Sequence, residues 1–148
     1  MINPNTPVII GVAQVEQRIT DPLLVQEPIE MMVDAVRQAA LDSGNADLLA
    51  EVESVRVIRG VWRYKHPAGY VAAKIGVPDA ETVGSPYGGN MVQSVVNQSA
   101  LDILRGDKSL IVITGAENGN SQAKARKAGV ELAVTETSGD YSRMIGQE

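Results

Sequence analysis

Residues 81–117, ETVGSPYGGNMVQSVVNQSALDILRGDKSLIVITGAE, decide how the rest of the chain is interpreted. Their pattern predicts a strand, a tight turn at 85–90, a long helix with one broad apolar stripe that ends at Gly106, and a second strand at 110–114. A helix start presents unpaired N–H groups and positive dipole character. The turn at 85–90 is therefore the first place where we expect binding of an anionic or carbonyl-bearing ligand.

The chain before residue 81 has the alternating pattern of an α/β protein. Residues 7–15, PVIIGVAQV, are predicted to form a buried strand in which Gly11 lets a neighbour approach closely. A helix with one buried face is predicted from Glu27–Pro28 to a stop at Gly44, followed by a strand within 52–60 and a short helix at 68–75. The order predicts an α/β fold with four strands. The continuous apolar run at 110–114 predicts a strand that is buried on both faces.

Composition excludes several classes of function. With 148 residues, one domain is expected, and the net charge of −5 offers no basic field for nucleic acid or an anionic membrane surface. No apolar run approaches the length of a spanning helix, so a cytoplasmic protein without nucleic-acid or membrane partners is expected. The absence of cysteine removes disulfides, thiolate metal sites and thiol nucleophiles, and the single His66 makes a metal site from this chain alone unexpected. His66 is interpreted as a surface residue in a loop, with a structural or neutral role or else a role in proton transfer.

The central stretch resembles the N-terminal half of the thiolase superfamily. The residues that carry the resemblance are the Gly-rich turn, the helix and strand in residues 90–118, NMVQSVVNQSALDILRGDKSLIVITGAEN, and the Gly115-Ala116-Glu117 signature at the strand end. Residues 7–18 and 27–44 also look like the first strand and helix of this family, especially of its sterol-carrier-type and thiolase-like acetyl-CoA acetyltransferase branches.

This resemblance implies a specific architecture. The fold would be α/β, a mixed sheet of four to five strands covered by helices, and it would be incomplete without a second, similar half. Residues 1–117 would form the thiolase-like half-domain, and residues 118–148 would begin the loop domain of the family, with part of it expected to be disordered. The family dimerises through the strand before the turn, so a homodimer through residues 81–84, or a second chain that completes the fold, is expected.

The resemblance also assigns roles to residues of the turn. The position of the family's nucleophilic cysteine falls at Gly88, with Tyr87 as its neighbour, and neither residue can do thiolate chemistry. A phenol has an ordinary pKa near 10 and is a poor acyl acceptor at neutral pH. Gly88, Gly89 and Asn90 are predicted to bind substrate through N–H groups that face a thioester oxygen, or else to serve only the shape of the turn. The catalytic residues are therefore unknown.

Alternatives remain both for a group of three basic residues and for the function of the whole chain. Lys124, Arg126 and Lys127 are predicted to contact coenzyme A phosphates, or to form a solvated helix face. The first functional hypothesis is a thiolase-like protein that binds coenzyme A or acyl-CoA, with no permanently bound cofactor, and that supports at most non-covalent carbon–carbon bond chemistry together with a second half. The alternative is a non-catalytic scaffold or interaction subunit. Dinucleotide binding is disfavoured because Gly11 is not followed by the further glycines of that motif.

Overall fold

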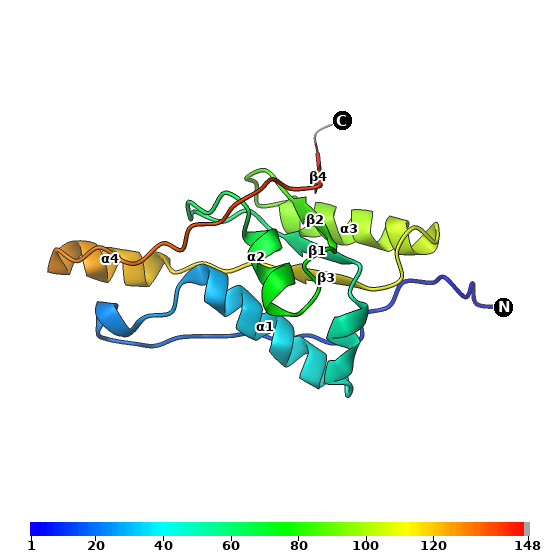
Figure 1. The fold of residues 1–148 in the computed structure, drawn as a ribbon, viewed down its shortest axis with the longest axis horizontal. Helices are drawn as coiled ribbons and strands as arrows, with labels where there is room; N and C mark the ends of the chain where they lie inside the picture. The colour runs from blue at the N-terminus through cyan, green and yellow to red at the C-terminus, as the bar shows by residue number, and fades with distance from the viewer. Residues whose placement is uncertain (147–148) are drawn as a thin grey trace.

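A four-stranded sheet with the strand order β3-β1-β2-β4 forms the centre of the fold, and all three strand pairings are parallel. The computed structural model describes residues 1–146. Its elements are α1 (Pro28–Asp42), β1 (Ser54–Val57), α2 (Pro67–Lys74), β2 (Glu81–Gly84), α3 (Met91–Leu104), β3 (Ile111–Thr114), α4 (Gly119–Ala128) and β4 (Arg143–Met144), with short 3-10 turns η1 (Pro22–Leu24) and η2 (Ala46–Glu51) (Figure 1). The predicted α/β class and the number of strands are confirmed, although β4 takes the place of the strand predicted at 7–15. Within residues 1–146 the sheet is parallel rather than mixed.

The two faces of the sheet are chemically different. Alternate residues of a strand point to opposite faces, so Val55 and Val57 of β1 lie on one face and join the aliphatic core with α1 and α2. Ser54 and Arg56 lie on the other face, where Arg56 bonds to residues of α3. The helices α1 and α2 therefore cover one side of the sheet and α3 lies on the other, as Figure 1 shows.

The helix ends follow the local signals in the sequence. Pro28 occupies the first turn of α1, where its missing N–H costs no hydrogen bond, and Glu30 adds negative charge near the positive end of the dipole. Beyond the helix, Gly44 adopts a φ of 86°, and Gly106 adopts a φ of 78° after α3. Residues with a Cβ rarely adopt this left-handed conformation, so glycine ends both helices at the predicted positions.

Residues 7–15 differ from their prediction as a buried strand. They are extended but pair with no strand among the described residues, and Val8, Ile9 and Val12 are exposed. Only one hydrogen bond is formed by this segment within residues 1–146, from the Val12 N–H to the Asp42 carboxylate at 2.9 Å. The close approach at Gly11 is confirmed, because a Cβ there would lie 2.1 Å from the Ala39 carbonyl oxygen of α1. A segment becomes a β-strand only when a neighbouring strand pairs with it. The apolar pattern of residues 7–15 cannot show whether such a neighbouring strand is present.

The predicted burial of residues 110–114 on both faces is also wrong. Val112 and Thr114 lie toward α1, and Thr114 donates a hydrogen bond to the Met32 carbonyl. On the other face Ile113 is 36% exposed, because β3 stands at the end of the sheet and α3 covers it only partly. A strand at the end of the sheet, with one neighbouring strand, thus keeps one of its faces partly exposed.

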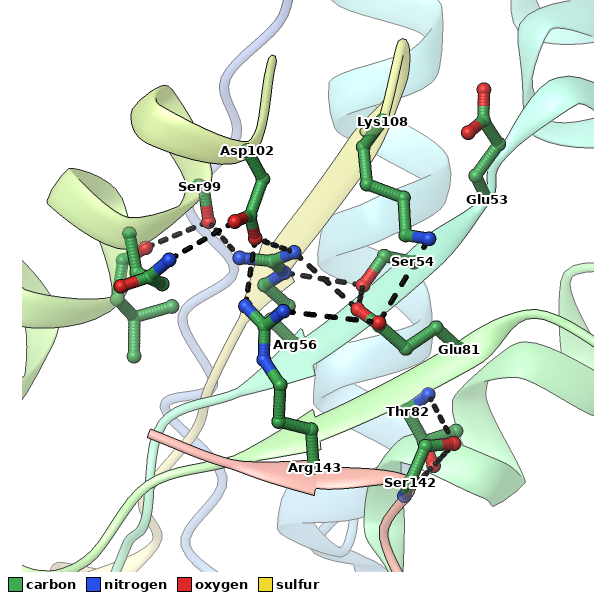
Figure 2. Close-up of polar contacts among 12 residues, drawn as sticks. Glu53, Ser54, Arg56, Glu81, Thr82, Ser99, Asp102, Lys108, Ser142 and Arg143 are labelled. Atoms are coloured by element: carbon green, nitrogen blue, oxygen red, sulfur yellow. Dashed lines mark hydrogen bonds and ion pairs between the residues drawn. The ribbon is translucent and has the colours of Figure 1, made fainter. Parts of the chain in front are cut away.

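A buried ion-pair network joins α3 and the C-terminal segment to the sheet (Figure 2). Arg56 has no exposed surface, and its guanidinium donates to Asp102 of α3 at 2.6 Å. Asp102 also accepts from Arg143 of β4 at 2.7 Å. The remaining donors of Arg56 bond to the hydroxyls of Ser54 and Ser99 and to the carboxylate of Glu81. One carboxylate of α3 therefore binds two arginines, one from β1 and one from β4.

Acidification should weaken this network. Burial on its own would raise the pKa of Asp102, but hydrogen bonds from Arg143, Arg56 and Gln98 outweigh it and lower the pKa from 3.8 to about 2. A carboxyl group whose folded-state pKa is depressed stabilises the fold above its unfolded pKa and loses that effect as the pH falls through the folded value. We expect the free energy of unfolding to drop by about 2 kcal/mol from this group between pH 5 and pH 2. Urea unfolding at several pH values checks this, and the Asp102→Asn variant should lose that part of the pH dependence.

Residues 130–146 return along the sheet and end at β4. Thr135 donates both its N–H and its hydroxyl to the Glu27 carboxylate, and Ser142 exchanges hydrogen bonds with Thr82 of β2. β4 pairs with Val83 and Gly84 and so occupies part of the β2 edge. The division between residues 1–117 and 118–148 stays a prediction, as does a homodimer through residues 81–84.

Candidate functional site

The carboxyl ends of the parallel strands define the candidate site. In open parallel sheets, ligands bind outside these ends, where successive connections leave toward opposite faces. Here β1 leads to α2 on one face and β2 leads to α3 on the other, so the loops after β1 and β2 flank the place where such a ligand would bind. We call this region the carboxyl-edge site and define it by Arg59, Trp62, Ser85, Tyr87 and Glu117.

The turn at 85–90 lies at this edge as predicted. Ser85 is buried, and its Oγ accepts the backbone N–H of Arg59 at 3.0 Å while it donates to the Pro86 carbonyl at 3.1 Å. This serine therefore ties the β2 turn to the loop after β1. Gly88, Gly89 and Asn90 are exposed, and Asn90 precedes α3 without a side-chain cap bond. Their role as substrate contacts stays a prediction.

Gly88, the residue that the resemblance assigns to the nucleophile position, lies close to the side chains of Asn90 and Met91. Its φ is 157°, and a Cβ built there would lie 2.8 Å from the Asn90 Oδ1 and 3.3 Å from the Met91 Cγ. A side chain at residue 88 would thus require Asn90 or Met91 to move. At Gly89 a Cβ would meet nothing within 4 Å. The φ of residue 88 therefore favours glycine more than the contacts do, because Asn90 is exposed and its side chain can turn away.

Arg59 is the feature of this site that the sequence did not reveal. Its guanidinium carbon lies 5.0 Å from the ring centre of Trp62 and 5.0 Å from that of Tyr87. Trp62 is buried and donates its Nε1–H to the Ala116 carbonyl at 3.1 Å, whereas Tyr87 is 56% exposed. The signal in the sequence would have been an arginine just beyond a strand end with a tryptophan three residues later. Pairing with Tyr87, 28 positions along the chain, depends on the fold.

Glu117 fixes the loop after β1. Its Oε1 accepts the Val61 N–H at 2.7 Å, and a Cβ at Gly60 would lie 2.7 Å from the same oxygen and 2.3 Å from the Trp62 Nε1. Glycine at residue 60 is therefore required for the loop to pack this closely. Glu117 thus connects the loop after β1 to the end of β3.

An apolar cavity of about 610 Å³ runs from this edge along β3. One wall is the extended segment Ile10–Ala13, another is α1, and a third is β3. Arg59 and Glu117 are its charged lining residues, and both lie at its carboxyl-edge end. The cavity is thus apolar along most of its length and polar where it meets the candidate site.

The three basic residues predicted to contact coenzyme A lie on α4. Lys124 lines a second cavity of about 480 Å³ together with Glu117, Asn118 and the residues around Val15–Ile19. Arg126 and Lys127 occupy the last turn of α4 and are exposed. None of these three cations lines the larger cavity, and Glu117 is the residue that lines both. Contact of the three cations with a ligand stays a prediction.

His66 is buried, contrary to its interpretation as a surface residue. Its Nε2 lies 3.0 Å from the Thr82 Oγ1 and its Nδ1 lies 3.1 Å from the Ser138 carbonyl oxygen. The Tyr141 ring packs edge-on against it, and burial raises the pKa of Tyr141 to about 12 even though Arg59 lowers it. One ring nitrogen of His66 thus contacts the C-terminal segment and the other contacts β2, so this residue links the two.

No family model matches this sequence, and no curated protein matches it. A solved structure does match: the crystal structure of a monomeric SCP2-thiolase like protein type 1 from Mycobacterium smegmatis, with a TM-score of 0.69 and 29% sequence identity over 80% of this chain. The match covers 25% of that protein, so this chain spans a quarter of its length. In residues 1–146, no helix has both the length and the apolar character needed to cross a membrane.

A parallel sheet with helices on both sides and a polar site at the carboxyl ends of its strands defines an α/β protein. More specifically, the chain has a partial thiolase-like fold, and its sequence lacks a cysteine to serve as nucleophile. The predicted resemblance is confirmed at the level of the fold.

Proposed function

We propose that this chain is the coenzyme A thioester-binding part of a thiolase-like protein that forms no covalent acyl-enzyme. The observation that carries the proposal is the combination of the thiolase-like fold with glycine at residue 88 and no cysteine in the sequence. The turn after β2 and the start of α3 lie at the carboxyl ends of the strands, where ligands of parallel sheets bind. Carbon–carbon bond formation or cleavage would then need groups that a second half supplies.

A polypeptide that completes the sheet is part of this proposal. β3 pairs only with β1 among the described strands, so its outer edge has free backbone groups, and the extended segment at 7–15 faces it across the apolar cavity. An edge with unpaired N–H and C=O groups is a template for another strand. The occupant of this apolar cavity is proposed to be a β-strand rather than an apolar small molecule. A strand would supply the backbone hydrogen bonds that the outer edge of β3 lacks.

The scaffold alternative has an observation of its own. The exposed side chains of Val8, Ile9 and Val12, next to an open sheet edge, are typical of an interaction surface. On this alternative, the fold serves to hold a partner chain and the carboxyl-edge site has no ligand. Acyl-CoA binding by the chain separates the two functions.

The test is a titration of the chain with acetyl-CoA in a calorimeter, followed by intact-mass measurement of the protein. We expect saturable binding and an unchanged protein mass, because no thiolate is present to accept the acetyl group. As a control, Gly89→Cys introduces a thiol at an open position of the same turn. An acetyl adduct on the unmodified chain would contradict the non-covalent proposal. Failure of acetyl-CoA to bind would favour the scaffold.

A further inference from the structure

Arg59 is positioned by aromatic rings rather than by an acidic partner. Arg56 and Arg143 pair with Asp102, and Arg18 pairs with Glu16. The Arg59 guanidinium forms neither an ion pair nor a hydrogen bond with the residues that the structure describes, and its side chain is exposed. Glu117, the acidic residue of the site, uses its Oε1 to accept the Val61 N–H instead.

Two aromatic rings hold this cation in place. Cation–π contacts use the charge of a guanidinium and the π-face of a ring but none of the guanidinium N–H donors. Such contacts occur roughly once per 70–80 residues, and here Trp62 and Tyr87 provide two to the same arginine. Burial of Trp62 and its bond to the Ala116 carbonyl make it a rigid support. The guanidinium is therefore ordered while its donors remain free.

The backbone of Arg59 is fixed to the turn that begins the candidate site. Its N–H donates to the Ser85 Oγ, and this serine directly precedes Pro86 and Tyr87. The guanidinium thus stands between the loop after β1 and the turn after β2, at the edge where ligands of parallel sheets bind. A planar guanidinium matches the oxygens of a carboxylate or phosphate with two parallel hydrogen bonds.

We propose that Arg59 is an anion-recognition residue of the carboxyl-edge site, in which the guanidinium held by Trp62 and Tyr87 binds an oxyanion of the ligand through paired N–H···O bonds. The oxyanion is a phosphate or a carboxylate. The inference rests on the proposed function in one respect: coenzyme A thioesters carry phosphates that would meet this requirement. Prior ordering of the side chain lowers the entropy lost on binding.

Calorimetry with four probes tests the proposal: acetyl-CoA, inorganic phosphate, butyrate, and S-acetylpantetheine, which has the thioester but no phosphate. In Arg59→Gln we expect the Kd for acetyl-CoA to rise about tenfold to a hundredfold, since a charge-assisted bidentate contact is lost. Binding of S-acetylpantetheine should stay within about twofold. Tyr87→Leu removes one exposed ring and should weaken acetyl-CoA binding about threefold.

The matched control is Arg105→Gln, which removes the same charge from an exposed position at the other end of α3 and should leave every Kd unchanged. Circular dichroism melts verify that all variants fold. Equal acetyl-CoA binding by Arg59→Gln and the unmodified chain would overturn the role of Arg59 and leave the proposed function standing. Arg59-dependent binding of phosphate or butyrate without any binding of acetyl-CoA would support Arg59 and overturn the proposed function. Absence of binding to all four probes would overturn both.

Discussion

Replacing Asp102 by alanine should lower the free energy of unfolding by about 3 kcal/mol, because the buried charge of Arg56 loses the nearer of its two carboxylates. Arg56 has no exposed surface, so water cannot replace the lost contact, and Glu81 at 3.4 Å is the carboxylate that remains. Arg143 would lose its 2.7 Å contact in the same step, and β4 would be held less firmly to the sheet. For a domain of ordinary stability, this loss is a large fraction of the total. Urea unfolding followed by circular dichroism measures it.

Two further variants separate charge from packing at Asp102. Asp107→Ala removes an exposed carboxylate just beyond the same helix and should change stability by less than about 0.5 kcal/mol. The double variant Arg56→Met, Asp102→Leu replaces the pair by apolar groups and should recover part of the loss, since buried ion pairs seldom outperform well-packed apolar residues. A fully stable Asp102→Ala protein would show that Arg56 is not desolvated in solution.

Replacing Trp62 by alanine should also cost about 3–5 kcal/mol of stability. The indole is 7% exposed, packs against Tyr64 with ring centres 5.5 Å apart, and joins the aliphatic core under α2. Its removal would leave a cavity and an unpaired Ala116 carbonyl, and it would take away one of the rings that order Arg59. Since this is the only tryptophan of the chain, unfolding must be followed by far-UV circular dichroism rather than by fluorescence.

Trp62→Phe is the matched control for that experiment. It keeps an aromatic ring in the core and over Arg59 but removes the Nε1–H, so a loss of about 1–2 kcal/mol is expected. Equal stability losses for the phenylalanine and alanine variants would show that the hydrogen bond to Ala116, rather than the packing of the ring, determines the effect.

The helices and the turn of the candidate site were predictable because their signals are local. Pro28, Gly44 and Gly106 act through their own backbone preferences within one or two turns of the helix they begin or end. The strands were harder to predict. The run at 110–114 is a strand as expected, yet its position at the end of the sheet exposes Ile113, and no local pattern encodes which strands become neighbours.

The central stretch at 81–117 by itself determined the order of strand, turn, helix and strand and the resemblance to thiolases, and the whole sequence showed that no cysteine is present. Only the tertiary structure decided that Arg56 is buried against Asp102, that Arg59 lies over Tyr87, and that the outer edge of β3 is open. The physical reason is the range of the interactions. Helix caps and glycine turns depend on neighbours along the chain, whereas ion pairs, cation–π contacts and strand edges depend on segments that folding brings together.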